Sequence, residues 1–131
     1  MSKYTLGLFF CLLSVITKSQ DYSNLWEGHF SYLNIIDVAK GNDKVFAATD
    51  NVLFIYDITS QDIETLTTID GLSGQDISAI HYSENYGLLL IGYENGLIEL
   101  ISDTSTDVLT VIDILEKPTI PPTSKRINHF N

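Results

Sequence analysis

The sequence predicts an all-β protein, an incomplete β-propeller of two four-stranded antiparallel blades with a leading strand and the start of a third blade. Three observations support this fold class. A unit of 42 to 45 residues occurs twice. Each unit holds four β-branched or aromatic runs separated by turn residues. The inner runs are continuously apolar, which indicates sheets covered on both faces. Repeated four-stranded sheets of this length are typical of propeller blades.

The repeat is visible as a direct alignment of two segments. Residues 49–56 (TDNVLFIY) align with residues 93–100 (YENGLIEL) at an offset of 44. Ile35 matches Ile77 at an offset of 42, and the start of the unit recurs once more at about residue 127. The sequence therefore predicts one blade over 35–70, a second over 77–113, and the beginning of another near 127.

Each predicted blade contains four strands. In the first blade the strands are expected at 35–39, 45–49, 52–56 and 63–68. In the second they are expected at 77–82, 88–93, 97–101 and 108–113. Asn95-Gly96 predicts a two-residue type I′ hairpin, because both residue types tolerate the positive φ that this turn needs. The second and third strands of that blade are therefore expected to be antiparallel neighbours.

The first residues have the layout of a signal peptide. Residues 1–4, with Lys3, form a short basic region, 6–16 is an apolar core, and small residues precede Gln20. A bilayer span needs about 20 apolar residues, so this core is too short for an anchor. We expect residues 1–20 to be removed, and Cys11 with them, which leaves 21–131 as the amino-terminal part of a propeller domain. An aromatic-rich leading strand is predicted over 25–32.

Charge excludes several classes of function. Residues 45–116 hold thirteen Asp or Glu and no Lys or Arg, so the surface would repel a nucleic-acid backbone. Without Cys11 the chain has no thiol, which excludes a thiol nucleophile or a thiolate zinc site. No serine nucleophile elbow, phosphate loop or metal cluster is present. We predict no catalytic, cofactor-binding or metal-binding residues and no cofactor.

Two predicted sheets cannot cover all of their own apolar faces. Large exposed apolar patches on a soluble protein mark a missing partner, so we expect the chain to be the amino-terminal piece of a larger propeller. A single eight-stranded sandwich is the alternative. It is disfavoured because a sandwich needs no repeated unit and leaves one face of each sheet polar.

The run 68–77 (TIDGLSGQDI), followed by 88–97 (LLLIGYENGL), resembles the blade signature of two-component-regulator propellers. More closely, the whole chain resembles the start of the PorZ family, components of the type IX secretion system of Bacteroidota. This resemblance rests on 54–57 (FIYD), 91–97 (IGYENGL) and 117–121 (KPTIP). It implies two successive propellers and a C-terminal domain, of which this chain would be the opening third or less.

The resemblance implies a non-enzymatic protein of the cell surface and outer membrane that handles anionic lipopolysaccharide, so that secreted cargo is anchored. Its implied partners are the other subunits of the attachment complex, with no nucleic acid. The acid-only segment should repel an anionic glycolipid unless divalent cations bridge them, so we expect another part of the protein to make that contact. Two alternatives stay open: the periplasmic sensor propeller of a hybrid histidine kinase, and a polysaccharide-acting propeller enzyme.

Three histidines remain as candidate functional residues. His81 lies on the innermost strand of the second blade, where it could face the central channel, although a solitary imidazole is more often structural. His29 and His129 have still less support. The loop 103–107 (DTSTD) lacks the Gly and Glu of an EF-hand and is interpreted as a hairpin loop, as is its counterpart 57–62.

The segment 118–122, with Lys125 and Arg126, is interpreted as an extended connection between units. A docking strip is the alternative interpretation of the same residues.

Overall fold

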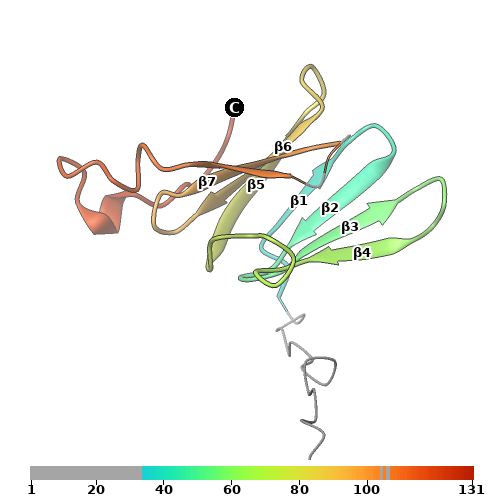
Figure 1. Cartoon of the computed structure of the whole chain (residues 1–131), viewed down its shortest axis with the longest axis horizontal. Helices are drawn as coiled ribbons and strands as arrows, with labels where there is room; N and C mark the ends of the chain where they lie inside the picture. Colours follow the sequence, from blue (N-terminus) through green and yellow to red (C-terminus); the bar gives the residue numbers. More distant parts are fainter. Residues whose placement is uncertain (1–33, 104, 106) are drawn as a thin grey trace, which may run out of the picture.

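The computed structural model describes residues 34–103, 105 and 107–131. The expected signal peptide and leading strand, and with them Cys11 and His29, lie outside the described residues. Within those residues the chain forms eight strands and one short 3-10 helix. The strands form two four-stranded sheets, each antiparallel and each in chain order, which confirms the all-β, two-blade architecture (Figure 1).

The two sheets correspond to the two predicted blades. The first sheet consists of β1 (Asp37–Lys40), β2 (Lys44–Ala48), β3 (Leu53–Asp57) and β4 (Ile63–Leu66). The second consists of β5 (Ile77–Ser83), β6 (Leu88–Tyr93), β7 (Ile98–Ser102) and β8 (Val108–Val111). All of the strand ends lie within two residues of the predicted ones. β4 ends early because Asp70 accepts hydrogen bonds from the backbone nitrogen and hydroxyl of Thr67, at 3.0 and 2.7 Å, which turns the chain there.

The hairpin at Asn95-Gly96 differs from the predicted type I′ turn. β6 and β7 are antiparallel neighbours as expected. The loop has three residues, 94–96. The backbone nitrogen of Gly96 donates to the backbone carbonyl of Tyr93, and the backbone nitrogen of Tyr93 donates to the backbone carbonyl of Leu97. Of the loop residues only Gly96 has a positive φ, at 88°. Asn95 instead accepts the nitrogen of Leu97 at 2.9 Å through its side chain, which favours the three-residue form.

The hydrophobic core lies between the two sheets. Residues alternate along β2, so that Phe46 and Ala48 face the second sheet and the ring of Phe46 stacks on that of Tyr82 at 5.6 Å. Leu72, from the loop between β4 and β5, is buried in the same layer. The core cluster comprises Phe46, Ala48, Leu53, Leu72, Ile77, Ile80, Tyr82, Leu89, Ile91, Tyr93, Leu97 and Ile101. Burial of this apolar surface holds the two sheets together.

The sheets meet along their first strands. Among the described strands, backbone contacts between the sheets join β5 to β1 and β2 alone (Figure 1). Asp37 on β1 also accepts the backbone nitrogen of Ile80 on β5 at 2.9 Å. In a sandwich the strands would face one another across the whole width of the sheets. Two meanders that contact through their inner strands are instead successive propeller blades.

The other face of the first sheet is apolar and open in the described part of the chain. Val38 on β1 is 58% exposed and Ile63 on β4 is 67% exposed. The register places Val45 and Phe54 on the same face as Val38. This is one of the two uncovered faces that the repeat predicted.

The segment after β8 covers part of the other open face. The backbone nitrogen of Ile127 donates to the backbone carbonyl of Tyr93, and the hydroxyl of Ser78 donates to the backbone carbonyl of Ile127 at 2.7 Å. No strand forms at 127–131 in the structure, so the start of a further blade there stays a prediction.

Two smaller findings concern helical structure. The prediction of an extended connection at 118–122 is wrong. This segment contains turns and leads into a 3-10 helix at Pro122–Ser124, and proline is favourable at the first position of a helix. Among the described residues no helix is long and apolar enough to span a membrane.

Candidate functional site

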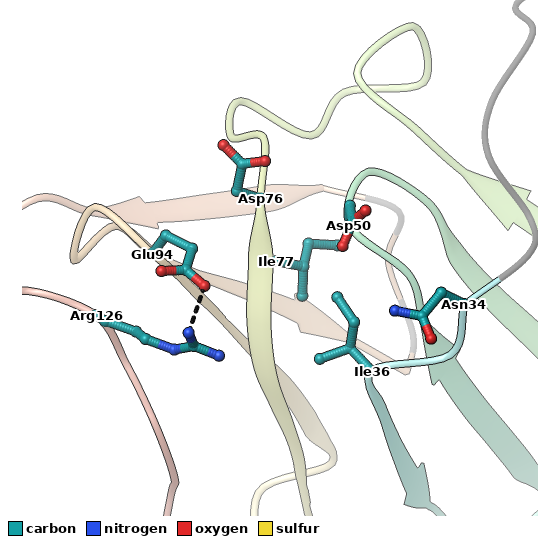
Figure 2. A pocket seen from close by; sticks show the side chains of 7 residues that line it. All are labelled: Asn34, Ile36, Asp50, Asp76, Ile77, Glu94 and Arg126. Atoms are coloured by element: carbon teal, nitrogen blue, oxygen red, sulfur yellow. Dashed lines mark ion pairs between the residues drawn. The ribbon is translucent and has the colours of Figure 1, made fainter.

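An open depression of about 640 Å³ lies where the inner strands of both sheets begin (Figure 2). Its wall combines the segment before β1, the turns between β2 and β3 and between β6 and β7, the start of β5, and the segment after β8. The lining residues are Asn34, Ile36, Asp50, Asp76, Ile77, Glu94 and Arg126. This end of the inner strands surrounds the axis of a propeller, where all of the blades converge.

Backbone hydrogen bonds position the acidic residues of the depression. The backbone nitrogen of Ile77 donates to the backbone carbonyl of Asp50 at 2.7 Å, which joins the β2–β3 turn of the first blade to β5 of the second. The backbone nitrogen of Glu94 donates to the backbone carbonyl of Asp76 at 3.0 Å. Asp76 has a φ of 64°, a left-handed conformation that aspartate tolerates better than most residues. The three carboxylates are therefore carried by hydrogen-bonded turns at adjacent strand ends.

The electrostatic character of the depression is acidic. The guanidinium of Arg126 pairs with the carboxylate of Glu94 at 2.8 Å, which leaves Asp50 and Asp76 without a cation in the lining (Figure 2). Such a surface accepts hydrogen bonds from hydroxyl or ammonium groups and disfavours phosphate. Among the described residues no group of three or more His, Cys, Asp or Glu side chains could hold a metal ion.

The histidines predicted as candidates lie elsewhere. The ring of His81 lies 6.5 Å from the ring of Phe130, on the side of β5 that faces away from the first sheet. His129 is exposed and contacts the side-chain oxygen of Asn131 at 2.6 Å. Neither residue lines the depression. The structural interpretation of His81 stays a prediction.

The first aspartate of each acidic hairpin loop accepts hydrogen bonds. Asp57 accepts the nitrogens of Thr59 and Ser60 at 2.8 and 2.9 Å, and these bonds hold the pKa of its carboxyl below the usual range. The loop 103–107 connects β7 to β8, and there Asp103 accepts the hydroxyl of Tyr82. This bond is the main cause that raises the pKa of Tyr82 to about 12, with burial second. Each of the two segments connects antiparallel neighbouring strands, β3 to β4 and β7 to β8, which agrees with the hairpin interpretation.

The rim of the depression was not predicted as a site. Asp50 and Glu94 occupy matching positions of the repeat, at an offset of 44, and this spacing was the one available signal. Asp76 and Arg126 carry no such signal, because the sequence gives no indication of which loops meet at the inner-strand ends.

Comparison with known proteins identifies the repeat. A family model described as the "TSS9, PorZ, N-terminal beta-propeller domain" matches residues 45–131. The chain belongs to this family. No curated protein matches the chain.

A solved structure of PorZ from Porphyromonas gingivalis is similar to this chain, with 24% sequence identity and a TM-score of 0.62. It is described as an essential bacterial surface component of the type-IX secretion system. The match covers 68% of this chain and 12% of that one, so the chain spans a small part of that relative's length. At this identity the likeness shows the fold.

A second similar structure is the extracellular domain of the putative one component system BT4673 from B. thetaiotaomicron, with 16% identity and a TM-score of 0.51. That match covers 64% of this chain and 11% of the other. It likewise shows the fold and no more.

Proposed function

We propose that this chain is part of a non-enzymatic, cell-surface component of a type IX secretion system, secreted across the inner membrane and working with the other subunits of the attachment complex. The observation that carries the proposal is the family match over 45–131. The description of the similar Porphyromonas gingivalis protein as a surface component of that system supports it.

We further propose that the whole protein handles anionic lipopolysaccharide while this region does not bind it directly. The charge of the depression supports this division. Within the described lining, Arg126 is the one cation, and it is paired with Glu94 rather than with Asp50 or Asp76. An anionic glycolipid would be repelled there, so the contact belongs to another part of the protein.

Deletion of the encoding gene tests the role in secretion. We expect cargo with type IX signals to be lost from the cell surface, and complementation with the full gene to restore it. Cargo that stays anchored at the parental level in the deletion strain would contradict the proposed function.

Binding experiments on the full protein test whether this region takes part in lipopolysaccharide binding. We expect Asp50→Asn and Asp76→Asn to leave the retention of lipopolysaccharide unchanged, both with calcium and with a chelator. If these substitutions lower retention more than about twofold in either condition, the depression takes part in glycolipid binding and the proposal for this region is wrong.

A further inference from the structure

A groove lies between the two sheets, at a distance from the depression described above. Its wall combines β3 and β4 of the first sheet with β7 and the following loop of the second. It has a volume of about 210 Å³. A smaller hollow of about 120 Å³ shares Lys44, Ile55 and Glu64 with it and continues along the loop between β3 and β4. We call the two together the inter-blade groove.

The groove has an apolar floor. Ile55 and Leu66 lie on the face of the first sheet that packs toward the second, and Ile101 faces them from β7. Ile101 is almost completely buried, while Ile55 and Leu66 are half-buried and keep part of their carbon surface uncovered. A large apolar side chain placed there would cover this surface.

The walls of the groove are acidic. Glu64 and Asp103 stand along it, and Asp57 and Asp62 line its smaller end. Lys44 is the one cation in the lining, and it lies directly across from Asp57 in the β2–β3 register. The backbone of Glu64 pairs with that of Ile55, but its side chain has no hydrogen bond or ion pair with any other residue that the structure describes, so its charge is available to a ligand.

The size and position of the groove favour an extended peptide. Its volume suits one or two side chains and is smaller than that of a typical small-molecule pocket, about 300–1,000 Å³. β4 pairs with β3 alone among the described strands, so no strand in the described part of the chain occupies its other edge, beside the groove. An extended segment can add to such an edge through its backbone and insert alternate side chains.

We propose that the inter-blade groove binds an extended segment of a partner protein in which a large apolar side chain stands beside Lys or Arg. The apolar side chain packs on Ile55, Leu66 and Ile101, and the cationic side chain lies against Glu64. This inference rests on the charge and shape of the groove and is independent of the proposed role in secretion.

The test uses the full chain and a fluorescein-labelled peptide, Gly-Ser-Arg-Leu-Arg-Ser-Gly. Fluorescence anisotropy measures the binding of the peptide at low and moderate salt. We expect Glu64→Lys to weaken binding about fivefold or more, since an exposed charge contact contributes up to about 1 kcal/mol and reversal adds repulsion. Glu116→Lys makes the same change of charge outside the groove and should alter binding less than about twofold. Glu64→Gln, with a smaller loss, replaces Glu64→Lys if the latter fails to fold.

Two control peptides separate the apolar and charged contributions. Replacing Leu by Ser, or both Arg by Glu, should each abolish most of the binding. Amide shifts in an NMR titration should be largest at Ile55, Glu64 and Leu66. The proposal is overturned if no binding is seen up to about 1 mM, about −4 kcal/mol. It is also overturned if the two Lys variants weaken binding equally, which would indicate attraction to the overall negative charge.

Discussion

The phenol of Tyr93 donates a hydrogen bond to the carboxylate of Glu99, and both side chains are fully buried between the two sheets. The other oxygen of Glu99 accepts the backbone nitrogen of Ser73 at 2.8 Å. A buried carboxylate is stable when its oxygens are hydrogen-bonded, as here. Through these bonds Glu99 on β7 holds the loop between β4 and β5 against the second sheet.

Replacement of this carboxylate should destabilise the fold. In Glu99→Gln the amide group must face one of the two donors, so we expect the free energy of unfolding to fall by about 1–3 kcal/mol. Glu116→Gln, on the exposed surface, is the matched control and should change it by less than about 0.5 kcal/mol. Denaturant unfolding measures both. Equal stability of the two variants would show that Glu99 is not a structural anchor.

The stability of the fold should decline at alkaline pH. The hydrogen bond to Asp103 and burial raise the pKa of Tyr82 to about 12, and burial with the bond to Glu99 raises the pKa of Tyr93 as well. A tyrosine whose pKa is higher in the folded state stabilises it fully below the unfolded value of about 10, and this contribution is lost as the pH rises toward the folded value.

We therefore expect the stability of the fold to fall between about pH 10 and 12, which circular dichroism would measure as loss of strand signal. Tyr82→Phe should make the stability fall less steeply over this range. Tyr86→Phe, at an exposed tyrosine, is the control and should leave the profile unchanged. A profile for Tyr82→Phe that coincides with that of the unmodified chain would contradict the assignment.

Two glycines approach their neighbours closely and should respond differently to alanine. A Cβ on Gly74 would lie 2.4 Å from the ring of Tyr93, which is buried and cannot move aside. We expect Gly74→Ala to lower the free energy of unfolding by about 1–3 kcal/mol. A Cβ on Gly92 would lie 2.5 Å from the side chain of Ile127 in the segment after β8. Gly92→Ala should displace that segment and leave the sheets in place.

Hydrogen exchange distinguishes the two glycine variants. In Gly92→Ala the amide of Ile127 should lose protection while amides of β5 and β6 keep theirs. In Gly74→Ala protection should fall across both sheets. Uniform loss of protection in Gly92→Ala would mean that the terminal segment and the sheets unfold as one unit.

Asp37 contributes a hydrogen bond to the contact between the blades. Its two carboxylate oxygens accept the nitrogen of Val38 and, across the interface, the nitrogen of Ile80, at 2.8 and 2.9 Å. Asp37→Ala leaves the nitrogen of Ile80 without this partner and should cost about 1–3 kcal/mol of stability. Asp37→Asn keeps one acceptor oxygen and should recover about half of the loss, which thermal unfolding of both variants would show. If the asparagine variant is as unstable as the alanine variant, the bond to Ile80 is not what joins the sheets.

The repeat made the strands predictable, while the turns and the burial of polar groups were not. β-branched runs and turn residues are local signals, so the eight strands lie within about two residues of their predicted ends. The three-residue loop at Gly96 was missed because an Asn-Gly pair fits both two-residue and three-residue hairpins. The side chain of Asn95 favours the longer form by accepting the backbone nitrogen of Leu97 at 2.9 Å.

The sequence by itself determined that the chain folds as two repeated four-stranded blades with apolar faces left over, because periodicity along a strand reports which faces are buried. Only the tertiary structure decided that Asp50, Asp76, Glu94 and Arg126 meet in one depression and that Glu99 is buried beside Tyr93. Those relationships join residues from different strands and loops. Their proximity depends on how the two sheets pack, which no local pattern specifies.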